Sequence, residues 1–526
     1  MAGTYEQDGD AAGTFLGHPK GLYVLFFAEM WERFSYYGMR ALLIFYLTKH
    51  WLFSDSESGV IYGAYTALVY ITPVLGGYLA DRYLGQRKAV MFGAVLLTLG
   101  HLFMAFEGEP AVGHSDNPVI YIFWLALALI IVGSGFLKAN ISVIVGQLYP
   151  RTDTRRDAAY TIFYMGINLG AAIGSLLCGY IGETYGWAYG FGLAGIGMLL
   201  GLVVFMWGKP LLLGRGEPPK PLAKNTEWTM YAIGIGMVGI CWAAIQFQDL
   251  VGYVLGGFGG ALVLYVLFIA VVKLPSEERD RIFAAMFLIL TSIVFWALFE
   301  QAGSSLNLFT DRHVDRGGVP ASTFQSINAI YIILLAPVFA IVWQFLGQKG
   351  LEPSAPFKFG LGVVQVGLGF LVLVWGANAV GLENATPVIF IFLIYLLHTT
   401  GELCLSPVGL SAMNRLAPAH MASLIMGTWF FASATGNFAA GLIAAATGAE
   451  GVGEEAGKQV VLDVYSTVGL YAVGIGIGVL VVSPLIKKLM HLDTLTDDTV
   501  DDDLVGQRGV GEPQAGGMRP ETRPAE

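Results

Sequence analysis

The chain has 526 residues, of which 55% are hydrophobic and 13% are charged, with a net charge of −10 and a mean hydropathy of +0.63. Soluble domains are typically about a quarter charged, so this composition excludes a soluble globular protein and indicates an integral membrane protein. The hydrocarbon core of a bilayer admits only helices or closed barrels, and the apolar runs here are long and nearly continuous. The predicted fold class is therefore an all-α membrane protein.

The first predicted element is a polar, acidic N-terminal segment, residues 1–20, which lacks the features of a signal peptide. About 20 apolar residues are needed to cross a bilayer as a helix. By that measure residues 21–207 form an N-terminal six-helix bundle, with spans at 21–49, 58–80, 88–106, 119–148, 158–183 and 187–207.

Residues 208–278 hold a polar linker and two further apolar runs, at 228–247 and 252–273. Residues 279–489 form a C-terminal six-helix bundle, with spans at 279–302, 321–347, 357–379, 386–413, 420–446 and 464–489. The acidic end of the chain, residues 490–526, has no apolar period, and we expect it to be a disordered tail. The sequence thus predicts 14 transmembrane helices: two bundles of six and an inserted helix pair.

The lysines and arginines predict the orientation in the membrane. When alternate loops are assigned to one side, that side collects 19 of these residues, whereas the other side holds only Lys49, Arg312, Arg316 and Lys458. Cytoplasmic loops carry the excess of positive charge. We therefore expect both termini, the linker and the tail to be cytoplasmic, in a multi-pass protein of the inner (plasma) membrane.

The first span, with the sequence AEMWERFSYYGMRALLIFYL at 28–47, carries charges that need an explanation. An ionised side chain at the centre of a membrane helix costs roughly 3 kcal/mol on insertion scales. On a helical wheel Glu29, Arg33, Tyr36 and Arg40 fall within roughly 60° of one another, and Glu32 and Tyr37 flank them. This polar stripe must face protein or a water-filled space.

Three other charges lie alone inside apolar spans. They are Lys138 in GSGFLKANISVIVG, Glu300 in FWALFEQAG and Glu402 in LLHTTGELCLSP. These charges could be interhelical ion pairs that only hold helices together. The electrostatic attraction within such a buried pair, however, is about as large as the free energy lost on desolvation, so the pair stabilises the protein little. Movable charges in a solvated cavity explain them better.

Aromatic and amide residues accompany the buried charges in the spans. They are Tyr70, Asn168, Trp296, Asn328 and Trp429. Trp296 and Glu300 are spaced i, i+4, as are Trp429 and Ser433, so each pair shares a helix face. A membrane tryptophan can equally be an interfacial anchor or a core filler, and only Trp296 has a charged neighbour that favours a site.

Three motifs carry a resemblance to a known family. The stretch EMWERFSYYG, at 29–38, resembles the ExxERFxYYG motif of the proton-coupled oligopeptide transporters, a branch of the major facilitator superfamily. GGYLADRYLGQRK, at 76–88, is similar to the loop motif of that superfamily, and FYMGINLGA, at 163–171, is similar to the fifth-helix signature of the family. The resemblance covers residues 20–490 and includes the extra helix pair of bacterial members.

The resemblance implies import of di- and tripeptides driven by inward proton flow. Carried over by position, Arg40 and Lys138 would receive the peptide carboxylate and Glu402 the amino terminus. The other binding residues that it implies are Tyr36, Tyr37, Tyr70, Asn168, Asn328, Trp296, Trp429 and Ser433. Proton coupling and gating would fall to Glu29, Glu32, Arg33, Lys138 and Glu300.

One departure from the family concerns the second helix. Animal members carry a histidine where this sequence has Gly63, so proton coupling here would rely on carboxylates. We further hypothesise that Lys138 and Glu300 form an ion pair between the bundles that is made in one state and broken in another.

Other functions are also compatible with this sequence. The same fold could carry nitrate or a drug-like solute, although an anion carrier would not need Glu402 or the glutamates of the first helix. A non-transporting peptide receptor could keep the pocket without proton-driven accumulation. An enzyme is disfavoured, because the sequence shows no catalytic triad, metal cluster or phosphate loop, and His398 is explained as a core or pore-lining residue. We expect no cofactor, a small-molecule substrate with protons, no nucleic acid, and a monomer in the bilayer.

Overall fold

The computed structural model describes residues 9–109, 117–150, 153, 155–218, 220–449 and 453–492. The predicted disordered tail lies outside these residues from position 493 onward. Nearly all of the described chain is helical, and its four strands have two residues each. They pair as β1 (Thr14–Phe15) with β2 (His18–Pro19) and β3 (Val314–Asp315) with β4 (Thr386–Pro387). The predicted all-α class is confirmed.

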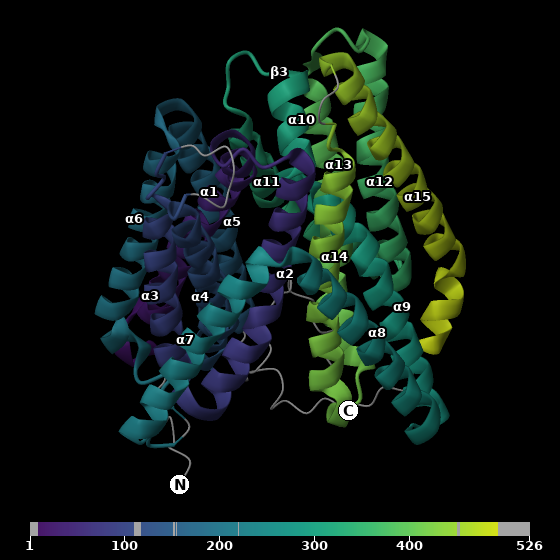
Figure 1. Ribbon diagram of the computed structural model, residues 1–526. Helices are drawn as coiled ribbons and strands as arrows, with labels where there is room; N and C mark the ends of the chain where they lie inside the picture. Colours follow the sequence, from purple (N-terminus) through teal and green to yellow (C-terminus); the bar gives the residue numbers. More distant parts are fainter. Residues whose placement is uncertain are drawn as a thin grey trace.

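The first six long helices form one bundle (Figure 1), and their hydrophobic core also takes in Leu308, Ala321 and Ala434 from later in the chain. The helices of this group are α1 (Lys20–Phe45), α2 (Asp55–Leu79), α3 (Gln86–Met104), α4 (Val119–Gln147), α5 (Arg155–Tyr185) and α6 (Trp187–Trp207). Two π-helical turns extend α1 and α2, at Tyr46–His50 and Ala80–Leu84. We refer to this group as the first bundle.

The second bundle has a separate core. It consists of α9 (Ser276–Phe299), α10 (Ser305–His313), α11 (Ser326–Gln348), α12 (Ala355–Val380), α13 (Ile389–Leu416), α14 (Ala422–Ala446) and α15 (Glu454–Leu489). The predicted span at 279–302 does not end there. A 3-10 turn, η5 (Glu300–Gly303), breaks the helix, and the chain then continues as α10.

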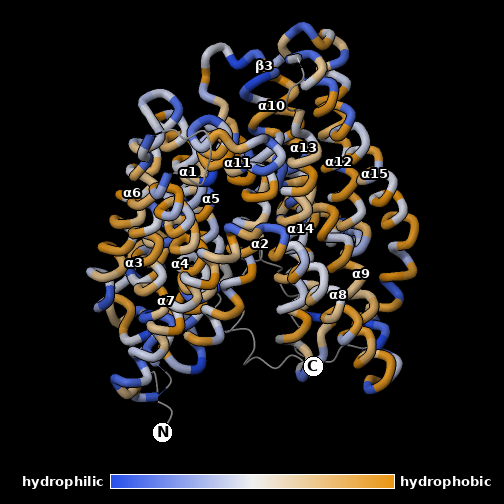
Figure 2. Tube along the Cα trace, in the orientation of Figure 1, coloured by the Kyte–Doolittle hydropathy of each residue, from blue (hydrophilic) through white to orange (hydrophobic). Residues whose placement is uncertain are grey.

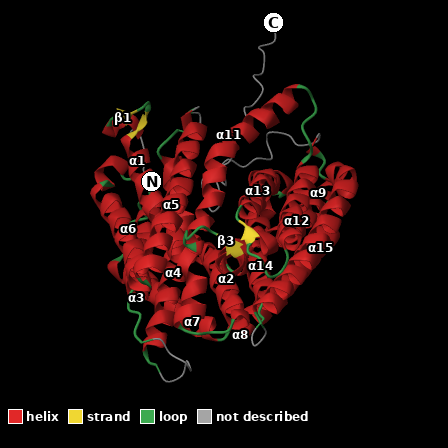
Figure 3. Ribbon diagram, turned by 90° about the horizontal axis from the view of Figure 1, so that it is seen from above, coloured by secondary structure: helices red, strands yellow, loops and turns green. Residues whose placement is uncertain are grey.

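The inserted pair consists of α7 (Lys224–Gln246) and α8 (Gln248–Lys273), which meet at Phe247. Seen along the helices, this pair lies across one edge of the molecule, with α7 against α4 and α8 against α14 (Figure 3). The inserted pair therefore contacts both bundles.

Among the described residues, 13 helices are long and apolar enough to cross a membrane. The first helix, α1, spans 26 residues and carries the charges of the polar stripe. Large apolar side chains remain exposed on the outer faces, including Trp207 at 82% and Tyr253 at 77%, and the hydrophobic colour follows the length of the helices (Figure 2). Such exposure is expected where lipid replaces water.

The bundles contact each other on the side where α10 lies, which we call the α10 side. An ion pair joins Arg312 to Asp55, another joins Lys49 to Asp311 at 2.7 Å, and Asn307 donates to the Ala41 carbonyl at 3.1 Å. Towards the opposite side, where α1 begins and α15 ends, the bundles diverge (Figure 1). We call this the terminal side.

Candidate functional site

Glycines on α5 allow α1 to lie deep in the first bundle. A Cβ at Gly166 would lie 2.9 Å from the ring of Phe26, and one at Gly170 would overlap the Met30 carbonyl group. Both glycines belong to the FYMGINLGA stretch. This stretch therefore brings the polar stripe of α1 into the interior of the protein.

Arg33 lies between the two glutamates of that stripe. Its Nε donates to Glu29 Oε1 at 2.7 Å and lies 3.3 Å from Glu32 Oε2. Both carboxylates are buried, at 1% and 0% exposed. In the described part of the chain, Glu29 Oε2 and both oxygens of Glu32 accept no hydrogen bond. One guanidinium thus serves two buried carboxylates, so their charges are balanced only with a second cation or a proton.

Lys138, on α4, joins this group of charges. Its Nζ lies 3.8 Å from the centroid of the Tyr36 ring, a favourable position for a cation, and it is close enough to Glu29 and Glu32 for electrostatic attraction. The sequence hypothesis paired Lys138 with Glu300. In this conformation Lys138 instead belongs to the α1 cluster, because a different cation holds Glu300.

That cation is Arg40, which forms an ion pair with Glu300 across the two bundles. Arg40 also donates from Nε to the Tyr62 hydroxyl at 2.5 Å. All three side chains are buried, with Arg40 at 7% and Glu300 at 2% exposed. A buried ion pair of this kind is costly to break from one side, so it is a contact that can distinguish two conformations of the bundles.

A second polar group lies on α11 and α13, in the second bundle. Asn328 donates to Glu402 Oε2 at 3.0 Å and to Thr399 Oγ1 at 3.0 Å. The Glu402 side chain is 5% exposed and is close enough to Tyr37 for electrostatic interaction. Tyr37 also interacts with Arg33 and Arg40, so a carboxylate of the second bundle and cations of the first lie around the same ring.

Aromatic side chains lie between the two charged groups. Tyr37 packs against Ala171 and Ala172 of α5 and Ala329 of α11, so it lies between the bundles. Tyr70, on α2, is within electrostatic range of Glu300 and Tyr37. Cations, carboxylates and aromatic rings therefore lie within electrostatic range of one another between the bundles.

The remaining predicted residues differ in their positions. Trp296 is partly exposed, while Asn168 donates to the carbonyl of Tyr164 within its own helix at 3.1 Å. Trp429 packs against Gly409 and Phe359 in the core of the second bundle, and Ser433 bonds back to the Trp429 carbonyl at 3.2 Å. This environment matches the core-filler interpretation of Trp429.

Gly63 and His398 are both structural in this conformation. A Cβ at Gly63 would lie 2.7 Å from Gly441 Cα, so the animal histidine has no room at the contact between α2 and α14. His398 is 1% exposed, contacts the ring of Phe370 and has Nε2 3.1 Å from the Val366 carbonyl oxygen. Its surroundings are those of a core histidine.

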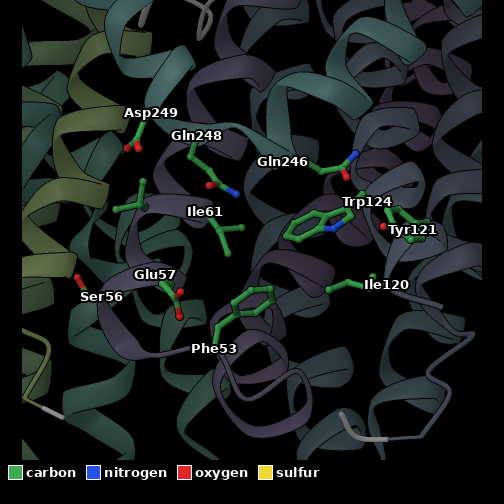
Figure 4. A pocket seen from close by; sticks show the side chains of 11 residues that line it. Phe53, Ser56, Glu57, Ile61, Ile120, Tyr121, Trp124, Gln246, Gln248 and Asp249 are labelled. Carbon is green, nitrogen blue, oxygen red and sulfur yellow. The ribbon is translucent and has the colours of Figure 1, made fainter. Parts of the chain in front are cut away.

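A separate cavity of about 490 Å³ lies near the turn between α7 and α8. Trp124, Phe53 and Tyr121 form aromatic walls, and Glu57 and Asp249 lie at its edge (Figure 4). It is lined by α2, α4, the segment that precedes α2, and the inserted pair. None of the predicted site residues lines it, so it is distinct from the charged groups described above.

Sequence reasoning missed two residues of the site. Tyr62, one position before Gly63, holds Arg40, and Thr399, three positions before Glu402, holds Asn328. Both are ordinary residues of an apolar span, and nothing in their spacing separates them from core residues. Only the packing of α2 on α1 and of α13 on α11 reveals them.

Known proteins resemble this chain over most of its length. Residues 87–457 match the profile of the POT family. The peptide transporter YePEPT of Yersinia enterocolitica is 38% identical over 82% of this chain and 88% of its own length. The chain belongs to the POT family.

Two further relatives of this POT family member are a di-/tripeptide transporter and a solved structure. The first, from Lactococcus lactis, is 34% identical over 80% of this chain and 88% of its own. The second is a crystal structure of the peptide transporter POT in complex with sulfate, 36% identical, with a TM-score of 0.77 over 91% of this chain and 97% of that one. The predicted major facilitator fold and family are confirmed: the protein is a multi-pass inner-membrane transporter and not an enzyme.

Proposed function

We propose that this protein imports di- and tripeptides together with protons by alternating access. The observation that carries the proposal is the opposition of charges between the bundles, with Arg40 and Lys138 on one side and Glu402 on the other. A peptide is a zwitterion with fixed ends and a variable middle. Cations at one end and a carboxylate at the other therefore recognise every short peptide, and the aromatic residues between them tolerate different side chains.

The coupling follows from the contacts of Arg40. While Glu300 is ionised it occupies Arg40, so a peptide carboxylate has to compete with it. A proton on Glu300 removes its charge and frees Arg40 for the peptide. Glu29 and Glu32 share Arg33 and form a second site for a proton. Protonation of either carboxylate would remove its charge and so its ion pair with Arg33.

The terminal side is the cytoplasmic side in this proposal, because the basic loops lie there. The contacts on the α10 side then close the outer half of the path, and the diverging bundles correspond to an inward-facing state. Both bundles of one chain contribute residues to the charged site, so a monomer contains a complete transport unit.

Uptake of labelled dialanine into liposomes tests the proposed function. An inward proton gradient, acidic outside, is expected to drive accumulation above equilibrium, and liposomes without the gradient are expected only to equilibrate. Binding of dialanine without gradient-driven accumulation would indicate a receptor, and accumulation of nitrate instead would indicate an anion carrier.

Replacing Glu32 with glutamine is expected to abolish proton-driven uptake and to leave counterflow exchange within about threefold of wild type, since the amide keeps the shape but cannot cycle a proton. Glu29→Gln is expected to behave in the same way. Both rates are measured in the same liposome preparation, with Glu57→Gln as a matched control, because Glu57 caps α2 away from the site. Equal loss of both rates would show that the glutamates are structural.

Replacing Glu402 with alanine is expected to weaken the binding of ordinary dipeptides by about tenfold or more, as for a lost charged hydrogen bond. Peptides with an acetylated amino terminus should lose much less, because they offer no ammonium group. Competition against labelled dialanine measures both affinities. An equal loss for the two kinds of peptide would remove Glu402 from the role of amino-terminus receptor.

A further inference from the structure

The turn η5, which carries Glu300, is held by a buried hydrogen-bond network. Gln301 is fully buried, and its Nε2 donates to the carbonyl oxygens of Ala297 and Ala440, both at 2.9 Å. Its Oε1 accepts from the Ser305 hydroxyl at 2.6 Å, and Ser305 in turn bonds to the Tyr465 hydroxyl at 2.8 Å. The network uses both ends of the amide.

The network around Gln301 reaches four helices. Its direct partners are Ala297 on α9, Ser305 on α10 and Ala440 on α14, and Ser305 extends the network to Tyr465 on α15. Ser305 and Tyr465 are 2% and 0% exposed, so water does not compete for these bonds. A satisfied polar network in a dry interior fixes one local geometry, and here it fixes the break between α9 and α10.

The same turn contacts the first bundle directly. Glu300, at its start, pairs with Arg40, and a Cβ on Gly303, at its end, would overlap the Tyr62 hydroxyl. Both contacts are made to the pair formed by Arg40 and Tyr62. A small displacement of η5 would therefore alter the ion pair and the packing between the bundles together.

We propose that Gln301 is a positioning residue for the coupling reaction: it ties the turn that presents Glu300 to α14 and α15, so that the geometry of the second bundle sets the Arg40–Glu300 pair. This inference rests on the proposed function, in which that pair couples proton and peptide. Gln301 itself touches neither the peptide nor the proton.

The test replaces Gln301 with methionine, which has a similar length and no hydrogen-bonding amide. Rates are measured per folded protein in liposomes, as proton-driven uptake and as counterflow exchange. The ratio of the first rate to the second is expected to fall about tenfold, the size expected when buried hydrogen bonds are lost. The matched control is Gln365→Met. Gln365 lies on α12 and bonds to the Leu361 carbonyl, and its substitution should keep the ratio within about twofold.

If Gln301→Met does not fold, Ser305→Ala replaces it as the test. This variant should also lower the ratio of proton-driven uptake to counterflow exchange, by a smaller factor.

A thermal double-mutant cycle tests the proposal without transport. If Gln301 acts through Glu300, the loss of Tm in Gln301→Met combined with Glu300→Gln is smaller than the sum of the single losses. Additive losses of Tm, or a ratio of rates that does not change in Gln301→Met, would overturn the positioning role. Failure of the wild-type protein to accumulate dialanine would contradict the proposed function instead, and the thermal cycle would still decide the role of Gln301.

Discussion

Alanine at Glu300 is expected to abolish proton-driven uptake and to lower the stability of the protein by about 3–5 kcal/mol, the usual cost of removing one partner of a buried ion pair. The substitution leaves Arg40 as an unbalanced buried cation, with only the Tyr62 hydroxyl as a close partner among the contacts described above. Arg40→Ala should cost a similar amount, because it leaves the Glu300 carboxylate without its cation.

The double variant Arg40→Ala with Glu300→Ala distinguishes two causes of destabilisation: an unpaired buried charge and the loss of side-chain contacts. It contains no stranded charge, so its loss of stability should be much smaller than the sum of the two single losses. Thermal unfolding in detergent measures all four proteins. Transport should stay absent in the double variant, since Arg40 also receives the peptide in the proposed mechanism. Additive losses of stability would mean that the two charges do not depend on each other.

The same cycle applied to Lys138 and Glu300 distinguishes the two possible partners of Glu300. In the conformation described here Lys138 lies over Tyr36, so little coupling of stability to Glu300 is expected in the absence of peptide. Coupling that appears only during transport would support an exchange of partners, in which Lys138 contacts Glu300 in another state.

Alanine at Gly63 is expected to reduce transport by about tenfold or more, and histidine at this position should abolish it. The new Cβ would lie 2.7 Å from Gly441 Cα and 3.1 Å from Gly441 N. Both neighbours are backbone atoms, which cannot move without shifting a helix, and overpacking of this kind typically costs about 1–3 kcal/mol. The contact between α2 and α14 lies on the α10 side, so its loss would remove the state that we propose to be inward-facing.

Gly192→Ala is the matched control for this substitution. Gly192 lies in the same bundle, and a Cβ at this position would have no described neighbour within 4 Å, so uptake should stay within about twofold of wild type. Uptake by Gly63→His at the wild-type rate would show that the helices can separate at this point. Distances between spin labels on the α10 side then show whether the bundles have moved apart.

The sequence predicts the helices well because each span is a local pattern of apolar residues. It also predicts the stripe of Glu29, Arg33 and Arg40, since these residues share one face of one helix. The partner of Arg40 is different. Glu300 lies 260 positions away, and its direction depends on a 3-10 turn that the apolar pattern does not mark.

Trp429 also shows that spacing along one helix does not predict which neighbouring helix a side chain meets. Its spacing to Ser433 places both on one face of α14, but spacing alone does not say whether that face meets the core or the charged site. In this structure Trp429 is close to Gly409 and Phe359, a packing environment that the spacing alone does not predict. Contacts between helices that are far apart in the sequence depend on packing across the whole bundle, and a single sequence does not predict that packing.

The inserted pair is anchored to both bundles by different contacts. On α7, Glu227 pairs with Lys88 at 2.7 Å, and on α8 the ring of Phe438 fills the space left by Gly252. A change in the angle between the bundles must therefore be absorbed near Phe247, where α7 and α8 meet. Both helices expose much of their surface to lipid, so such a change also rearranges the surrounding acyl chains. Bilayer thickness and lateral tension thus enter the free-energy difference between the conformations of this protein.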